Sequence, residues 1–149
     1  MYRLSFAILG NEADARDAMQ ETLLGAWRQL RGLREPARFD PWLQRIVVNS
    51  ARQVIRSKQR RRTREIPASV VESLAGLPAP SARDDAAVLD AALAILPVEV
   101  RSILVLHHLE GRGVAELAEI LQVPAGTVKS RLFTARQALA ASIAREEGR

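Results

Sequence analysis

The feature that most restricts the fold is the spacing of apolar residues, which recur three and four positions apart along most of the chain. This spacing places them on one face of an α-helix, and no stretch shows the alternation that predicts a half-buried strand. Prolines interrupt the pattern in one weakly charged segment, which is typical of a connector: Pro67, Pro78 and Pro80. We therefore predict an all-α protein, with two small helical domains at residues 1–65 and 85–149 joined by a flexible linker at 66–84.

Composition argues against several classes of protein. The 149 residues include no cysteine, which excludes disulfides and thiolate metal sites. No apolar run approaches the length that crosses a bilayer, and the N-terminal segment lacks the arrangement of a secretory signal. His107 and His108 are the only histidines, and no glycine-rich phosphate loop is visible. We expect a cytoplasmic protein that is not inserted in a membrane, is not an enzyme, and binds neither metal nor cofactor.

The charge is distributed unevenly along the chain. Residues 1–63 contain thirteen Lys or Arg against six Asp or Glu, whereas the remaining residues contain nine against eleven. A surplus of positive charge in one half favours a polyanionic partner, with nucleic acid favoured over membrane. A solvated arginine-rich surface explains the charge equally well, so charge alone leaves both interpretations open.

A first amphipathic helix is predicted in NEADARDAMQETLLGAWRQLRGL, with Asn11 as its N-cap. One face gathers the residues that we expect to be buried: Ala15, Ala18, Met19, Thr22, Leu23, Ala26 and Leu30. The opposite face presents Asp17, Gln20, Glu21, Leu24 and Arg28. An apolar anchor within a polar rim is typical of a protein-docking surface, but single exposed leucines are ordinary. The spacing alone supports both readings of Leu24.

A second helix is predicted in FDPWLQRIVVNSARQVIRSKQRRR, with Asp40 as N-cap and Pro41 at the first helical position. The expected buried stripe is Leu43, Ile46, Val47, Ser50 and Val54. The far side and its edge carry basic, amide and aromatic side chains: Trp42, Arg45, Asn49, Arg52, Gln53 and Arg56. Arginines hold phosphates, an amide can read a base edge, and an aromatic ring can stack on an unpaired base. We interpret this face as a nucleic-acid-binding surface rather than a solvated basic helix.

The second half contains the pattern of a helix-turn-helix. A short apolar stripe (Val114, Leu117, Ala118 and Leu121) precedes the turn QVPAG, and a second helix is predicted to start near Thr127. Its expected buried residues are Val128, Leu132, Ala135 and Leu139. Its outer face carries Lys129, Ser130, Phe133, Thr134 and Gln137, flanked by Arg131 and Arg136. In a DNA-reading helix the ring of Phe133 can contact a thymine methyl, and Lys129 can reach a guanine edge or a phosphate.

The chain resembles the extracytoplasmic-function (ECF) sigma factors, the small two-domain promoter-specificity subunits of bacterial RNA polymerase. The resemblance covers nearly the whole chain and rests on three segments: GNEADARDAMQETLLGAWRQL, FDPWLQRIVVNSARQVIRSKQRR and LPVEVRSILVLHHLEGRGVAELAEILQVPAGTVKSRLFTAR. The string GTVKSRL also occurs in other bacterial regulators with related helix-turn-helix domains. The upstream matches QET…W and PWL…I…VN distinguish this chain from those regulators.

The resemblance implies an RNA polymerase sigma factor that directs promoter-specific transcription initiation, with sigma domain 2 at residues 1–65 and sigma domain 4 at 85–149. It assigns docking on core polymerase to Asp17, Gln20, Glu21 and Leu24. It assigns the minus-ten element to Trp42, Arg45, Asn49, Arg52, Gln53 and Arg56. It assigns the minus-thirty-five element to Thr127, Lys129, Ser130, Arg131, Phe133 and Arg136.

The same resemblance implies the partners of the chain and shows where its sequence differs from the family pattern. The expected partners are bacterial core RNA polymerase and promoter DNA, with an anti-sigma factor as a further partner that the family admits. The free chain is expected to be a monomer. Met1 falls inside the family's first helix, so that helix is expected to be shortened, and Thr134 stands where the family often has arginine. The alternative is a stand-alone helix-turn-helix regulator that binds duplex DNA without polymerase.

Overall fold

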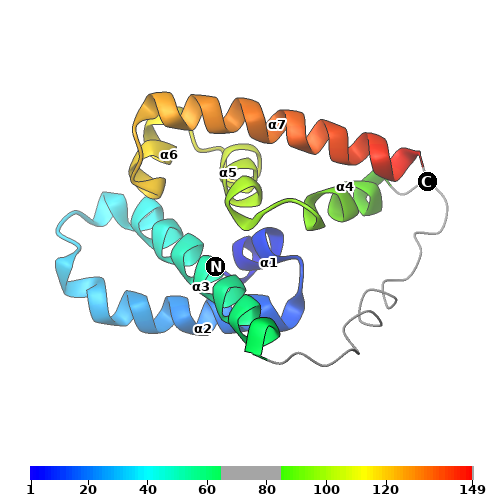
Figure 1. Cartoon of the computed structure of the whole chain (residues 1–149). Helices are drawn as coiled ribbons and strands as arrows, with labels where there is room; N and C mark the ends of the chain where they lie inside the picture. Colours follow the sequence, from blue (N-terminus) through cyan, green and yellow to red (C-terminus); the bar gives the residue numbers. More distant parts are fainter. Residues whose placement is uncertain (65–84, 149) are drawn as a thin grey trace.

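The structure is a computed structural model that describes residues 1–64 and 85–148, and every regular element in these two ranges is helical (Figure 1). The first range forms α1 (Tyr2–Leu9), α2 (Glu12–Gln29) and α3 (Phe39–Arg64), with the short 3-10 turns η1 (Leu30–Gly32) and η2 (Pro36–Arg38) between α2 and α3. The second range forms α4 (Asp85–Ala94), α5 (Val98–His108), α6 (Val114–Leu121) and α7 (Ala125–Glu147). The all-α fold class is confirmed. The predicted linker at 66–84 lies outside the described residues.

Local sequence signals explain where the first helices begin and end. Gly10 ends α1 in the left-handed region, at φ 69°, which costs glycine little because it has no Cβ. Asn11 caps α2 as predicted, since its side chain accepts a hydrogen bond from the backbone N–H of Asp14 at 3.1 Å. The prediction of Asp40 as the N-cap of the next helix is wrong. The turn η2 leads directly into α3 at Phe39, so Asp40 lies inside the first helical turn.

Small residues allow α2 and α3 to lie close together. Ala15, Ala18 and Thr22 are buried as predicted, and a Cβ added to Gly25 would lie 3.2 Å from Cγ2 of Ile46 on α3. The expected burial of Leu23 and Leu30 is wrong, since these side chains are 50% and 49% exposed. The contact runs along a narrow strip of small residues, and the larger side chains beside this strip therefore stay in solvent.

Helix α3 is covered on more than one side. Its predicted stripe is confirmed, with Ile46, Val47, Ser50 and Val54 buried and Leu43 half-buried. Val48 and Ala51 are buried as well, and so is the polar Gln44. These additional positions are covered because α5 and α6, from the second half of the chain, also contact α3.

A single apolar cluster therefore runs through both described parts. It joins Leu4 and Ile8 of α1 to Ile103 and Leu106 of α5, and it continues into the helix-turn-helix through Leu117. Helix α1 contacts α5, and α3 contacts α5 and α6. In this arrangement the two halves share one core.

The helix-turn-helix has the predicted form. Val128, Leu132 and Ala135 of α7 are buried and Leu139 is half-buried. Helix α6 ends at Leu121 and is capped by Gln122, which takes the left-handed conformation with φ 54°. Helix α7 begins at Ala125, two residues before the predicted start.

Candidate protein and nucleic-acid interfaces

The outer face of α2 is open to solvent. The four residues assigned to docking, Asp17, Gln20, Glu21 and Leu24, are all exposed, and the side chain of Leu24 is 48% exposed. At 100° per residue they share one side of the helix. The structure therefore brings these four predicted residues together on one accessible face.

Trp27 enlarges this face, and the sequence reasoning missed it. Its side chain is 80% exposed, and it lies three residues after Leu24 and four after Leu23 on the same helix. Interface hot spots are enriched in tryptophan, and contiguous exposed apolar patches mark interaction sites. Its spacing from Leu24 was the available signal, but the same spacing relates Trp27 to Leu23 and Leu30, which were expected to be buried. We call Leu23, Leu24, Trp27 and Leu30 the α2 apolar face.

The residues assigned to the minus-ten element lie along the outer side of α3. Asn49, Gln53 and Arg56 are exposed, whereas Trp42, Arg45 and Arg52 are half-buried. The Nε atom of Arg52 is buried and has no partner among the described residues. Trp42 lies beside Phe39, with ring centroids 5.6 Å apart. The two amide side chains are thus accessible, while the indole ring and the two arginine side chains are partly covered.

A cavity of about 690 Å³ lies at the start of this row. Its lining includes Trp42 together with four arginines from separate segments: Arg28, Arg34, Arg38 and Arg45. Glu119 of α6 closes one side and lies 3.2 Å from NH1 of Arg38. Guanidinium groups around an indole ring suit a phosphate and an unstacked base. Sequence reasoning found Trp42 and Arg45 but missed the other three arginines, because the turns η1 and η2 bring them together.

The outer face of α7 is also as predicted in its accessibility. Lys129, Ser130, Arg131, Phe133 and Arg136 are exposed and Thr127 is half-buried. The ring of Phe133 is 63% exposed on the second helix of the helix-turn-helix. A groove-sized helix with basic and hydroxyl side chains around an exposed ring is suited to reading a DNA major groove.

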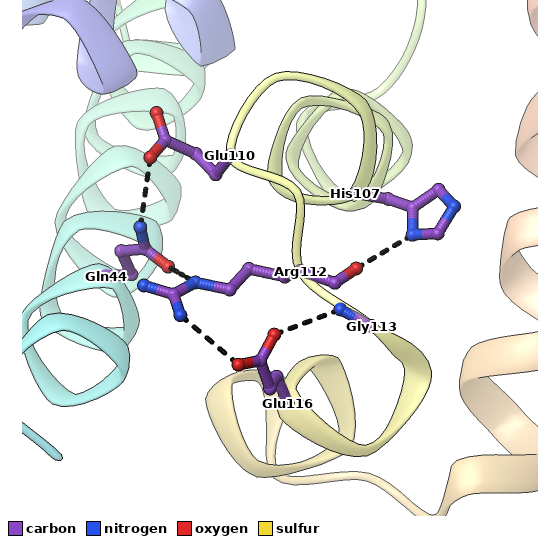
Figure 2. Close-up of polar contacts among 6 residues, drawn as sticks. All are labelled: Gln44, His107, Glu110, Arg112, Gly113 and Glu116. Atoms are coloured by element: carbon purple, nitrogen blue, oxygen red, sulfur yellow. Dashed lines mark hydrogen bonds and ion pairs between the residues drawn. The ribbon is translucent and has the colours of Figure 1, made fainter.

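A polar network joins α3 to the loop before α6 (Figure 2). The Gln44 side chain donates to Oε2 of Glu110 at 3.2 Å and accepts from Nε of Arg112 at 2.8 Å. Glu116 accepts from the backbone N–H of Gly113 at 3.0 Å and lies 3.4 Å from NH1 of Arg112. Glu110 and Arg112, the partners of Gln44, are 66 and 68 residues from it in sequence, so no local pattern indicates this network.

The two histidines lie at the end of α5, with ring centroids 4.8 Å apart. His107 is half-buried and His108 is exposed. Partial withdrawal from water lowers the pKa of His108, and the nearby His107 and Arg136 lower it further. Within residues 1–64 and 85–148, no group of three or more His, Cys, Asp or Glu residues is placed to hold a metal ion. Of the helices in the same ranges, none combines the length and apolarity that crossing a membrane requires.

Comparison with known proteins places both halves in one family. Residues 1–61 match the family described as Sigma-70 region 2, and residues 86–139 match Sigma-70, region 4. The chain is 36% identical over 143 residues to the ECF RNA polymerase sigma factor SigE of Mycolicibacterium smegmatis, a match that covers 93% of this chain and 55% of that protein. It is 34% identical over 141 residues to the ECF RNA polymerase sigma factor SigM of Mycobacterium tuberculosis, covering 94% and 69%.

A third relative is longer than either of these. The probable RNA polymerase sigma factor RfaY of Xanthomonas campestris is 35% identical over 139 residues, which cover 89% of this chain and 35% of that protein. This chain therefore spans about half of SigE and about a third of RfaY.

Solved structures show the same fold. The sigma factor RpoE, in complex with the anti-sigma factor NepR from Bartonella quintana, aligns with a TM-score of 0.66 and 24% identity over 95% of this chain and 88% of that chain. CnrH, in complex with the cytosolic domain of CnrY, aligns with a TM-score of 0.61 and 25% identity over 94% and 77%. With region 2 and region 4 both matched, and relatives of this identity, the chain belongs to the ECF RNA polymerase sigma factor family.

Proposed function

We propose that this chain is an ECF sigma factor that binds core RNA polymerase and directs promoter-specific transcription initiation. The observation that carries the proposal is the α2 apolar face, where Leu24 is 48% and Trp27 is 80% exposed. Exposing large apolar side chains to water is unfavourable unless a partner covers them. Core polymerase is such a partner for a sigma factor.

The division of labour follows the two matched regions. We assign residues 1–65 to sigma domain 2 and residues 85–149 to sigma domain 4, which the matches at 1–61 and 86–139 support. The chain acts by binding and catalyses no reaction of its own, and it works in the cytoplasm where it meets core polymerase. The similarity to RpoE, whose structure is a complex with the anti-sigma factor NepR, supports an anti-sigma factor as a further partner. The free chain is a monomer.

Domain 2 captures the minus-ten element through α3. Arg45 and the arginines of the adjoining cavity hold the backbone of an unpaired strand, and Trp42 stacks on a base. Asn49 and Gln53 are exposed on the same helix, and their amides can bond to base edges. Domain 4 grips the minus-thirty-five duplex with Lys129 and Phe133 on α7.

Three variants of the full chain test this division. Leu24→Asp places a carboxylate in the α2 apolar face. The matched control is Leu89→Asp, which makes the same substitution at a comparably exposed leucine of α4, outside that face. Asn49→Ala removes one exposed amide from α3. We would measure co-elution with core RNA polymerase and open-complex formation on a promoter selected by the wild-type holoenzyme from a randomised library.

Leu24→Asp is expected to weaken core binding by about 30-fold or more, as the loss of an interface hot spot does, while Leu89→Asp leaves it unchanged. Asn49→Ala is expected to bind core normally and to form fewer open complexes. Wild-type protein that binds duplex DNA tightly as a dimer and does not co-elute with core polymerase would instead identify a stand-alone regulator.

A further inference from the structure

The ring of His107 lies between two parts of the helix-turn-helix region. His107 is in the last turn of α5, and its Nδ1 atom is 2.8 Å from the backbone oxygen of Arg112 (Figure 2). On the other side of the ring, Nε2 is 3.1 Å from NH2 of Arg136 on α7. The ring therefore connects the loop before α6 to a residue on the outer face of α7.

The chemistry of the two partners fixes the state of the ring. A backbone carbonyl oxygen only accepts hydrogen bonds, so Nδ1 carries the proton and donates a hydrogen bond to the carbonyl oxygen of Arg112. A guanidinium group only donates, so Nε2 has its lone pair free and accepts from Arg136. The neutral ring with its proton on Nδ1 is the one form that makes both bonds.

We propose that His107 is a positioning residue for DNA recognition, which holds the guanidinium of Arg136 in place at the edge of the DNA-facing surface of α7. This inference rests on the proposed function, in which Arg136 contacts the minus-thirty-five element. An arginine side chain that is already held in place loses less conformational entropy when it binds DNA. Immobilising one long side chain on binding costs about threefold to tenfold in affinity. His107 itself needs no contact with DNA for this effect.

The contact is made within the second half of the chain. His107, the Arg112 carbonyl and Arg136 all lie there, so no residue of α3 takes part in it directly. The side chain of Arg112 binds Gln44 and Glu116, and it is the backbone oxygen of Arg112 that holds the ring. His108 lies beside His107 on α5, and Glu116 on α6 is bonded to Arg112 and Gly113.

Two substitutions divide the functions of the ring. His107→Gln puts an amide oxygen at about the distance of Nε2 and so keeps an acceptor for Arg136. His107→Asn keeps an amide donor near the position of Nδ1 for the Arg112 carbonyl but is too short to reach Arg136. A residue that merely stabilises the loop is therefore rescued by Asn, whereas a residue that positions Arg136 is rescued by Gln.

The experiment measures the Kd of the reconstituted holoenzyme for a duplex that carries the minus-thirty-five element, selected by the wild-type holoenzyme from a randomised pool. We expect His107→Asn to weaken binding by about threefold to tenfold and His107→Gln to stay within about twofold of wild type. Arg136→Ala should weaken binding, and adding His107→Asn to it should cause no further loss. Thermal unfolding of each variant checks that the chain is folded.

Each outcome is decisive. Suppose that Arg136→Ala weakens binding. If His107→Asn then binds DNA with wild-type affinity, or if both His107 variants lose affinity equally, the positioning role is overturned. Unchanged affinity for Arg136→Ala overturns the assignment of Arg136 to the minus-thirty-five element, and the inference fails with it. Failure of the wild-type chain to assemble with core polymerase is instead the failure of the proposed function.

Discussion

Arg101 places a guanidinium inside the apolar contact between α1 and α5. Its side chain is only 8% exposed, and NH1 donates to the backbone oxygen of Leu9 at 3.3 Å. Its Nε atom is buried without a partner among the described residues. Burial lowers the pKa of Arg101, and the carboxylate of Glu99 acts in the opposite direction. The charge therefore costs free energy at this position, while the aliphatic stem fills space.

Substitutions at Arg101 should separate the stem from the charge. Arg101→Met keeps the stem and removes the buried charge, so we expect the free energy of unfolding to stay within about 1 kcal/mol of wild type. Arg101→Ala leaves a cavity and is expected to lose about 2 to 4 kcal/mol. Urea unfolding followed by circular dichroism measures both. An equal loss in the two variants would show that the bond to the Leu9 carbonyl dominates instead.

At the scale of the element, the start of α6 depends on one side chain. Its N-cap is Gly113, which has no side chain to accept a hydrogen bond. Glu116 instead satisfies a different donor at this end of the helix, accepting from the Gly113 N–H at 3.0 Å. A carboxylate in the first turn also interacts favourably with the helix dipole. The first helix of the helix-turn-helix is therefore stabilised by a residue three positions inside it.

Removing this side chain should destabilise the second half of the chain. Glu116→Ala is expected to lower the free energy of unfolding by about 1 kcal/mol, the usual cost of a lost cap. Glu116→Gln keeps an acceptor for Gly113 and loses the charge near Arg112, so its loss should be about half as large. Thermal unfolding of the two variants compares them directly. A Gln variant as unstable as the Ala variant would assign the effect to the charge rather than to the hydrogen bond.

The helices that sequence predicts well are those whose large apolar side chains recur on one face, because that face is the one that is buried. Helix α7 is an example, because Val128, Leu132 and Ala135 face inward at regular spacing and Phe133 faces outward. Helix α2 is harder, because its contact with α3 runs along small residues and leaves Leu23 and Leu30 exposed. Apolarity alone does not distinguish a leucine in the core from an exposed leucine on a binding surface.

The candidate sites divide in the same way. The outer faces of α2, α3 and α7 follow from helical spacing, and their residues are exposed or half-buried as a binding surface requires. The arginine-lined cavity and the Gln44 network depend on how separate segments meet. Arg28, Arg34 and Arg38 converge through two 3-10 turns, and Gln44 meets Glu110 and Arg112 across the contact between the two halves. Such contacts depend on the tertiary fold and produce no periodic pattern in the sequence.

At the scale of the whole molecule, the shared core has a thermodynamic consequence. Apolar residues of α1 and α3 pack in one cluster with residues of α5, α6 and α7, and Gln44 adds polar contacts across the same boundary. Each half alone is about the size at which a domain folds only marginally. Each half should therefore stabilise the other, and the free chain should unfold in one cooperative transition.

Tryptophan fluorescence tests this coupling because both tryptophans, Trp27 and Trp42, lie in the first half of the chain. Trp42 is the reporter, since it is half-buried, whereas Trp27 is already 80% exposed when folded. Leu106→Ala truncates a fully buried leucine of α5 in the second half and is expected to cost about 2 to 5 kcal/mol. Leu109→Ala, at a leucine that is 55% exposed, is the matched control.

With a shared core, Leu106→Ala moves the Trp42 transition and the circular dichroism transition to the same lower denaturant concentration, although the substitution is in the other half of the chain. Leu109→Ala leaves both transitions close to wild type. A Trp42 transition that stays at the wild-type midpoint while circular dichroism reports earlier unfolding would mean that the two halves fold independently. The contacts of α5 and α6 with α1 and α3 would then contribute little to the stability of the free chain.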